Sequence, residues 1–153
     1  MIRPSSSVLL IMPRNFESFG IQFLYPDNWK QVERADDEGT EGVTLELPSG
    51  GFFTVERARD DDLAEEVVDQ MAQTFESDYD EVESERVDLP GLSDREAAME
   101  FRFYYLDLLV VSRLIVLDLD GGTVVVQMQA ESRDFDENEL VFDALIKQIR
   151  QLV

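Results

Sequence analysis

The most regular part of the sequence lies between residues 97 and 130, where apolar and polar positions alternate in three successive runs. In the first run, Met99, Phe101, Phe103 and Tyr105 are separated by Glu, Arg and Tyr residues. A period of two is typical of a β-strand that buries one face. The run therefore predicts a strand with these four side chains in the core.

The second and third runs predict the rest of an antiparallel meander. Residues 109–119 are apolar on both faces, with Ser112 and Arg113 as the clear polar interruptions. This pattern indicates a central strand that is covered from both sides. An Asp-Gly step at 120–121 suits the positive φ angles of a hairpin turn, and strict alternation resumes over residues 124–130.

Shorter patterns predict the other strands. Upstream of the meander they indicate a strand, a hairpin and a charged edge strand over residues 21–25, 43–58 and 82–89. A polar loop is expected over 31–42, and a tight turn at 107–108 is expected to join the first two strands of the meander. Trp29, the single tryptophan, is expected to fill the core rather than to bind a ligand.

Two stretches carry apolar residues three and four positions apart, which predicts amphipathic helices. Asp62 is the expected N-cap of the first helix, whose apolar stripe runs over residues 64–75. Asp134 or Asp136 is expected to cap the second helix, whose stripe runs over 141–152. Two helices and a central strand apolar on both faces predict an α+β fold. In this fold an antiparallel sheet of about six to seven strands is sandwiched between helices.

A chain of 153 residues is long enough for one domain with a sizeable core. We expect an N-terminal arm over residues 1–15 and a single domain over residues 16–153. Within the arm, the apolar run from Val8 to Met12 is expected to form a short strand or to lie on the core.

The absence of cysteine and histidine excludes several kinds of chemistry. Disulfides, thiolate zinc sites, cysteine nucleophiles, Ser-His-Asp triads and acid–base catalysis by histidine all require these residues. Without cysteines, the redox compartment of the protein stays undetermined.

The chain has 34 acidic and 13 basic residues, which gives a formal net charge of -21. This charge repels nucleic acid and anionic membranes, whereas it is compatible with a basic protein, a basic peptide or a cation as a partner. Solubility or adaptation to salt explains the same acidic excess without any partner. No apolar run reaches the roughly 18 residues of a membrane span and no signal peptide is recognisable, so a cytoplasmic location is expected.

The stretch FGIQFLYPDNW at residues 19–29, together with the order of the elements, resembles the PsbP-like α/β/α sandwich superfamily. Its members often open with a Gly-aromatic strand ending in Tyr-Pro-x-x-Trp, and they end with a hairpin and a terminal helix. The resemblance spans roughly residues 16–153. The superfamily includes the extrinsic P protein of photosystem II, a Ran-binding nuclear import factor, bacterial lipoproteins and chaperones of type VI secretion effectors.

This resemblance implies docking and assembly roles rather than catalysis. The fold alone does not choose among the roles, and the lipobox cysteine of the lipoproteins is missing. No binding residue is carried over from any member, because the matched positions are structural ones.

The first functional hypothesis is a non-catalytic protein-binding module, an adaptor or a chaperone, and not an enzyme. Residues 109–119 are rich in apolar side chains, and residues 101–105 are rich in aromatic ones. If one face of the sheet is left uncovered, it would capture an amphipathic helix, a basic surface or a second copy of the chain. The candidate partner-binding residues are Tyr104, Val111, Arg113 and Ile115. The opposing interpretation is that the two helices simply bury both faces.

The second hypothesis is a carboxylate-based cation-binding protein, or a small-ligand-binding or enzymatic domain. In this interpretation Glu46 and Glu56 face each other across the first hairpin, and the acidic runs at 36–38 and 60–62 converge. Acidic runs in loops are usually only solvated, so we predict no catalytic residue, no metal site and no cofactor.

Arg113 is a charged residue inside the predicted central strand. One interpretation is a cross-strand ion pair with a carboxylate such as Glu100. The other is a cation that meets an anionic ligand in a cleft.

Overall fold

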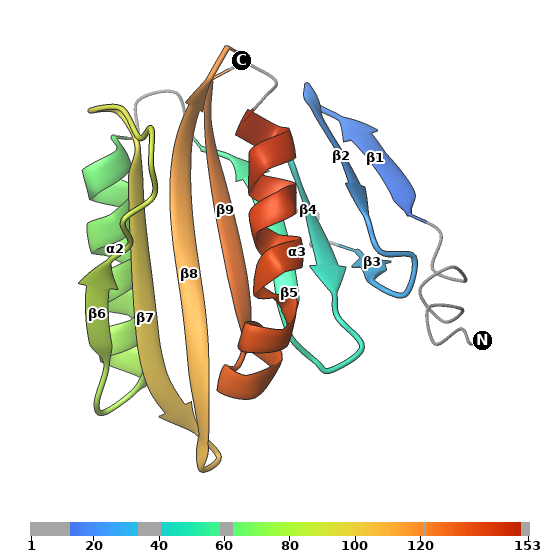
Figure 1. Cartoon of the computed structure of the whole chain (residues 1–153). Coiled ribbons are helices and arrows are strands. Elements are labelled where there is room, and N and C mark those ends of the chain that lie inside the picture. The colour runs from blue at the N-terminus through green and yellow to red at the C-terminus, as the bar shows by residue number, and fades with distance from the viewer. Residues whose placement is uncertain (1–12, 34–40, 59–62, 121, 151–153) are drawn as a thin grey trace, which may run out of the picture.

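The computed structural model describes residues 13–33, 41–58, 63–120 and 122–150. In chain order the elements are β1 (Arg14–Ser18), β2 (Ile21–Tyr25), β3 (Lys30–Val32), β4 (Gly42–Glu46), β5 (Phe52–Arg57), α2 (Ala64–Asp78), β6 (Glu83–Arg86), β7 (Ala97–Tyr105), β8 (Leu108–Leu119), β9 (Gly122–Glu131) and α3 (Ser132–Arg150). Figure 1 shows the long β7, β8 and β9 strands at the centre of the molecule.

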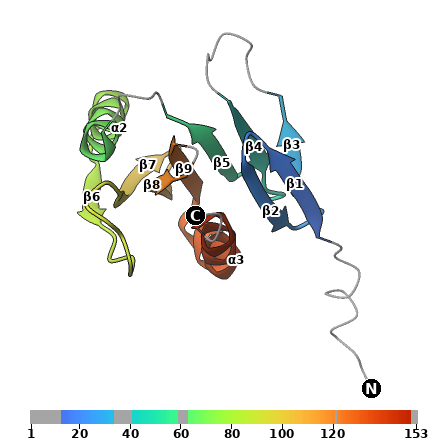
Figure 2. The same cartoon turned by 90° about the horizontal axis from the view of Figure 1, so that it is seen from above.

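The described strands form two sheets. Seven of them make the main sheet in the order β3-β4-β5-β9-β8-β7-β6, and β1 pairs with β2 in a separate ribbon. Every strand pair is antiparallel. In Figure 2 the helices α2 and α3 lie on opposite faces of the main sheet, α2 against β7 and β8, and α3 against β8 and β9.

The larger core lies between the main sheet and α3. Its most deeply buried side chains include Leu45, Phe53, Leu117, Val126, Met128, Phe142, Leu145 and Ile149. Burial of a large apolar side chain stabilises a fold by about 1.5–3 kcal/mol, so this layer supplies much of the driving force. Trp29 is buried here and its ring packs against Phe53 and Phe142, which confirms that it fills the core.

The β1–β2 ribbon is fastened to α3 by a side chain as well as by apolar packing. Gln148 of α3 accepts a hydrogen bond from the backbone N–H of Leu24 at 2.8 Å and donates one to the Leu24 carbonyl at 3.2 Å. The amide of Gln148 thus replaces the neighbouring strand that the edge of β2 lacks.

The smaller core lies between the main sheet and α2. Val68 and Phe75 of the helix pack against Phe101, Phe103 and neighbouring apolar side chains of β7 and β8. The ring centroid of Phe75 lies 5.0 Å from those of both phenylalanines. The predicted stripe of α2 therefore faces the sheet.

The α+β fold, the meander and the edge position of the charged strand are confirmed. β7, β8 and β9 pair consecutively, and β6 is the last strand on its side of the sheet. The apolar residues on both faces of β8 are divided between the two cores, as expected for a covered central strand. The hairpin predicted over 43–58 is formed by β4 and β5.

Strands were missed in two places. The predicted loop over 31–42 begins inside β3, which pairs with β4 at the edge of the sheet. β1 pairs with β2, although the sequence predicted a single strand there. Both strands are short, and one repeat of an alternating pattern is too little to identify a strand.

The turn at the end of β7 also differs from the prediction. Tyr105 is paired with Leu108, so the two-residue loop is Leu106-Asp107 and not 107–108. Tyr105 was expected in the core but is 55% exposed. The reason is that β6 pairs with β7 only as far as Arg102, so the end of β7 extends beyond its neighbour.

Both helices start elsewhere than predicted. Leu63 is the N-cap of α2, and Glu66 accepts a hydrogen bond from its backbone N–H at 3.2 Å. α3 begins at Ser132, directly after β9, where the carboxylate of Glu131 accepts a hydrogen bond from the N–H of Arg133 at 2.9 Å. In each case a Glu side chain satisfies a backbone donor near the first turn, so neither Asp134 nor Asp136 is needed as a cap.

Some predictions concern residues outside the described part of the chain. These are the apolar run at 8–12, the N-cap at Asp62, the acidic runs at 36–38 and 60–62, and Leu152. The boundary between an arm and a domain near residue 15 stays a prediction. None of the described helices is long and apolar enough to cross a membrane.

Candidate functional site

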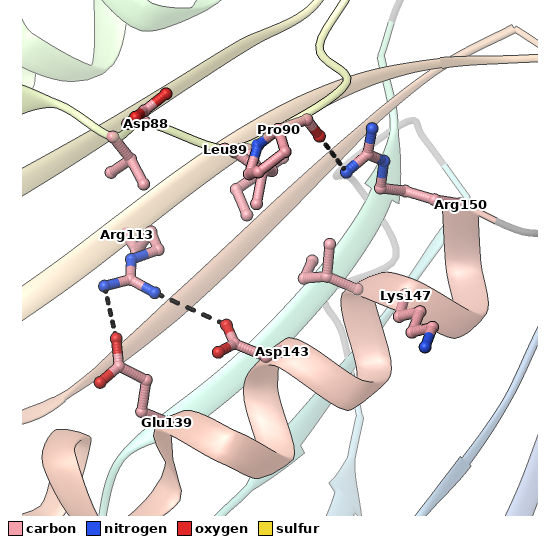
Figure 3. Close-up of a pocket in the computed structure, with 11 residues that line it drawn as sticks. Asp88, Leu89, Pro90, Arg113, Glu139, Asp143, Lys147 and Arg150 are labelled. Atoms are coloured by element: carbon pink, nitrogen blue, oxygen red, sulfur yellow. Dashed lines mark hydrogen bonds and ion pairs between the residues drawn. The ribbon is translucent and has the colours of Figure 1, made fainter.

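A groove lies on the α3 side of the sheet, and we call it the α3 groove. Its walls are residues 87–90, which follow β6, and the side of α3 from Glu139 to Arg150. Arg113 and Ile115 of β8 form its floor, and its volume is about 730 Å³. Figure 3 shows Arg113 between the two walls, with Glu139 and Asp143 reaching toward it from α3.

The groove lies between the segment that follows β6 and the helix α3, which both pack on the same face of the sheet. The segment that follows β6 packs its partly buried Val87 and Leu89 onto the larger core. Ile115 and Ile146 are buried beneath the groove. The groove therefore combines the apolar Ile115, Ile146 and Leu89 with the charged Arg113 on its floor and charged side chains along α3.

Arg113 is held by carboxylates on two elements. Its Nε and Nη2 atoms donate hydrogen bonds to Oε1 of Glu100 at 3.1 and 2.8 Å, and Nη2 also donates to Glu139 at 3.0 Å. Nη1 lies 3.8 Å from a carboxylate oxygen of Asp143, and the guanidinium lies 5.0 Å from the ring centroid of Phe135. The cross-strand ion pair with Glu100 is confirmed.

These contacts also set the protonation of the site. Burial is the largest single influence and lowers the pKa of Arg113, but the hydrogen bonds and charges of Glu100 and Glu139 together raise this pKa more, so the net shift is upward. Burial raises the pKa of Asp143, while the charge of Arg113 lowers it and Glu139 raises it again. The net pKa of Asp143 lies above its usual range.

The other end of the groove is basic. Arg150 donates a hydrogen bond from Nη1 to the carbonyl of Pro90 at 3.0 Å, which connects the two walls (Figure 3). Lys147 lies one turn before it on α3. Within the described residues, neither side chain forms an ion pair with a carboxylate. The groove is thus acidic near Glu139 and Asp143, and basic near Arg150.

A second notable surface is the end of the β7–β8 hairpin, residues 104–109, which we call the hairpin tip. β9 pairs with β8 only from Val110 onward, so the tip extends beyond the neighbouring strands. Figure 1 shows it projecting past the end of the main sheet. The most exposed of its large side chains are Tyr104 at 64%, Tyr105 at 55%, Leu106 at 78% and Leu108 at 49%.

The turn at this tip carries backbone strain. Leu106 has a φ angle of 50° and Asp107 one of 65°, and neither is a glycine. A two-residue hairpin loop usually needs positive φ at both positions, which Asn and Gly adopt at little cost. Leucine is one of the residues that rarely adopts this conformation, at a cost of about 1–2 kcal/mol.

The part of the sheet that α2 leaves uncovered is polar. On that face β4, β5 and β9 present Thr44, Thr54 and Gln127, among other half-buried side chains. The two threonine hydroxyls lie 3.2 Å apart, and Gln127 donates a hydrogen bond to Ser112 at 3.0 Å. An open apolar sheet face therefore does not exist there.

The four predicted partner-binding residues all point to the α3 side of the sheet, but they do not form one site. Arg113 and Ile115 lie in the α3 groove, and Val111 between the groove and the tip is buried. Tyr104 lies in the hairpin tip. The segment 87–90 and the groove side of α3 were missed.

A signal for part of the missed wall is present in the sequence. Glu139, Asp143, Lys147 and Arg150 follow at spacings of four, four and three, so they lie along one side of a helix. The position of residues 87–90 has no such signal, because it depends on how the chain after β6 crosses the sheet.

The paired carboxylates proposed for a cation site do not meet. Glu46 is opposite Phe52, whereas Glu56 is opposite Gly42. Four residues along a strand separate the two positions by about 13 Å. The described part of the chain contains no group of three or more acidic residues that could hold a metal ion.

No protein-family model matches the sequence, and no curated protein matches it significantly. Among solved structures, the solution structure of cyanobacterial PsbP (CyanoP) from Synechocystis sp. PCC 6803 has a TM-score of 0.60 and 14% identity. The alignment covers 91% of this chain and 92% of the cyanobacterial one. The fold is PsbP-like.

Two further structures match with lower similarity. PA94 from Pseudomonas aeruginosa, a protein of unknown function described as a putative regulator, has a TM-score of 0.46 and 12% identity, with coverage of 86% and 91%. LpqN, involved in cell envelope biogenesis of Mycobacterium tuberculosis, has a TM-score of 0.37 and 15% identity, with coverage of 92% and 82%. The fold rests on the cyanobacterial structure, and at 14% identity a function is not transferred.

Proposed function

We propose that the protein is a non-catalytic binding module that holds a segment of another protein in the α3 groove. The supporting observation is the groove itself, about 730 Å³, which places apolar side chains beside the Arg113 network. A concave apolar surface with charged edges is the usual form of a binding site for an amphipathic segment.

The dimensions fit a short helix. Glu139 and Arg150 lie eleven residues apart on α3, which corresponds to about 16 Å at about 1.5 Å per residue. A partner helix of about three turns would lie along this length. Its apolar stripe would contact Leu89, Ile115 and Ile146, and its polar face would stay in water.

The pairing of Arg113 favours this occupant over an anionic small ligand bound at that residue. Arg113 donates hydrogen bonds to Glu100 and Glu139 and is close to Asp143, so its positive charge is already neutralised. The carboxylates of Glu139 and Asp143 are engaged with Arg113 rather than placed for acid–base work. A binding role therefore fits the groove better than an enzymatic one.

Selection from a random peptide library tests the proposal. Peptides of about twelve residues form about three helical turns, and those retained by the purified protein are then titrated against variants. Leu89→Glu places a charge on the apolar wall and is expected to weaken binding at least tenfold. Leu92→Glu is the matched control, because Leu92 is partly buried in the same loop but does not line the groove.

Failure to enrich any peptide, or equal loss of affinity in both variants, would contradict the proposal. Since grooves of 300–1,000 Å³ also suit small molecules, a metabolite screen by thermal shift follows in that case. The cytoplasmic location and the possible homodimer stay predictions, which fractionation of cells and light scattering would test.

A further inference from the structure

The hairpin tip is built as a projection and not as the edge of a packed layer. β6 stops pairing with β7 at Arg102, and β9 stops pairing with β8 at Val110. Phe103 is still buried against α2, but residues 104–108 are all exposed. Within this exposed stretch, the ring of Tyr105 contacts that of Tyr79, with centroids 6.3 Å apart. Neither main-sheet neighbour covers the tip.

Large apolar side chains are concentrated on this projection. Four of the seven large hydrophobic side chains that are exposed in the described part of the chain belong to residues 104–108. Tyr105 pairs with Leu108 and faces the α2 side, whereas Tyr104 pairs with Leu109 and faces the α3 side. Leu106 lies at the apex. The tip is therefore a wedge that is apolar on both sides, which suits insertion into a pocket better than contact with a flat surface.

The backbone strain in the turn also indicates a binding role for the tip. Asn or Gly at position 106 would adopt its positive φ angle more easily than leucine, and either would also remove an exposed apolar side chain. Leu106 is thus unfavourable for the isolated protein in two respects. Unfavourable conformations of this kind cluster at binding surfaces, where the partner makes use of the side chain.

Charge selects the kind of partner. Asp107 lies in the turn itself, and Asp78 and Asp80 flank Tyr79, whose ring is stacked on Phe103 with centroids 4.1 Å apart. With a net charge of -21, a second copy of the chain or an anionic membrane would be repelled from this surface.

We propose that the hairpin tip inserts into an apolar pocket of a folded protein partner whose rim is basic. This surface is separate from the α3 groove, and the inference does not depend on the groove being occupied. The partner's pocket would take Leu106 at its centre, with Tyr104 and Leu108 against opposite walls. Basic residues around the pocket would face Asp107 and the other carboxylates near the tip.

The test uses Leu106→Asn, which should stabilise the fold while it removes the apolar side chain that the partner would contact. Wild-type protein, Leu106→Asn and Leu140→Asn are immobilised and exposed to a lysate of the native organism. Leu140 is the matched control, since it is 83% exposed but lies on α3, away from the tip. A partner of the tip is retained by wild type and by Leu140→Asn, and is lost with Leu106→Asn.

Capture alone does not decide the matter, so the retained protein is then purified. A photo-reactive analogue in place of Leu108 identifies the residues that it contacts. The expected result is a crosslink to an apolar pocket with basic neighbours, together with an affinity at least tenfold weaker for Leu106→Asn. The affinity should also fall as salt concentration rises. The melting temperature of Leu106→Asn should equal or exceed that of wild type.

Three results would overturn the inference. One is that no protein distinguishes wild type from Leu106→Asn and from a second variant, Leu108→Ser. Another is a crosslink to a surface without basic residues. The third is a dimer of this chain in light scattering that Leu106→Asn dissociates, because the occupant would then be a second copy.

Discussion

Both ends of the β7–β8 hairpin carry large apolar side chains, but their environments are opposite. At the base, Ile115 is buried under α3 and the charged Arg113 is enclosed with Glu100. At the tip, Tyr104 and Leu106 are exposed. The difference lies in the neighbours, because β6, β9 and α3 cover the base but end before the tip.

This contrast shows that apolar content alone does not decide what is buried. The base holds a charge in the interior by surrounding it with carboxylates, which is possible only where several elements converge. The tip leaves large apolar groups in water, which is stable only if the rest of the fold compensates. Each end therefore departs from simple patterning, and each carries one of the two proposed surfaces.

The largest expected effect is a difference in stability between alanine variants of two β7 residues that lie on the same face of the strand. Phe103→Ala should destabilise the fold by about 4 kcal/mol, since Phe103 is 2% exposed and packs on Phe75 and Tyr79. Tyr105→Ala, two residues further toward the tip, should cost less than about 1 kcal/mol. Urea denaturation of both variants measures the difference. Equal losses would mean that the tip is packed as tightly as the base.

The second prediction concerns the charge at the base. Arg113→Ala should destabilise the fold by about 2 kcal/mol, because it removes both hydrogen bonds to Oε1 of the buried Glu100 and leaves that carboxylate with Arg102 alone. The control is Arg86→Ala, which breaks a two-bond pair with Glu65 on the surface and should cost about 0.5 kcal/mol. The shift of the urea midpoint checks both values. A small effect for Arg113→Ala would show that the network is not held in the interior.

The third prediction concerns the turn at the tip. Leu106→Asn should stabilise the fold by about 1 kcal/mol, because asparagine adopts a positive φ angle more easily than leucine. Thermal unfolding is the measurement, with Leu140→Asn as a control for the removal of an exposed leucine from a helix. A clear loss of stability would mean that Leu106 is packed in the isolated protein.

The smallest effect is a pH dependence at the groove. Burial is the main reason that the pKa of Asp143 is raised, so between its unfolded and folded pKa values the folded state binds more protons than the unfolded one. The contribution of Asp143 to stability is therefore fully present below the unfolded pKa, and it is lost as pH rises through the folded pKa.

Asp143→Asn should remove this dependence of the free energy of unfolding on pH in mildly acidic solution. At neutral pH it should change stability by only a few tenths of a kcal/mol, since the carboxylate is partly exposed and screened. Denaturation curves at several pH values compare the variant with wild type. An unchanged slope would show that Asp143 does not titrate abnormally.

Most of the fold could be predicted from the sequence, because long alternating runs and helical stripes report directly on buried faces. The meander and the stripe of α2 are examples. The short strands β1 and β3 could not be predicted in this way, since each depends on a partner strand rather than on its own pattern. The N-caps of both helices were assigned to aspartates near the helix start. In the structure a glutamate accepts the hydrogen bond from a backbone N–H there, and it can do so from several positions.

The candidate site was only partly predictable. Arg113 and its pairing with Glu100 follow from strand register, and both could be anticipated. The α3 groove depends on residues 87–90 crossing the sheet beside the helix, and the exposure of Tyr105 depends on where β6 and β9 end. Neither feature is encoded in the local pattern of the residues concerned.

The most direct test is an amide chemical-shift map of the ¹⁵N-labelled protein, titrated with a peptide selected from the library. Binding in the α3 groove predicts shifts at residues 87–90, at Arg113 and Ile115, and along α3 from Glu139 to Arg150. The amides of the hairpin tip should stay unchanged. Shifts confined to the tip or to the polar face over β4 and β5, with the groove amides unmoved, would contradict the proposal.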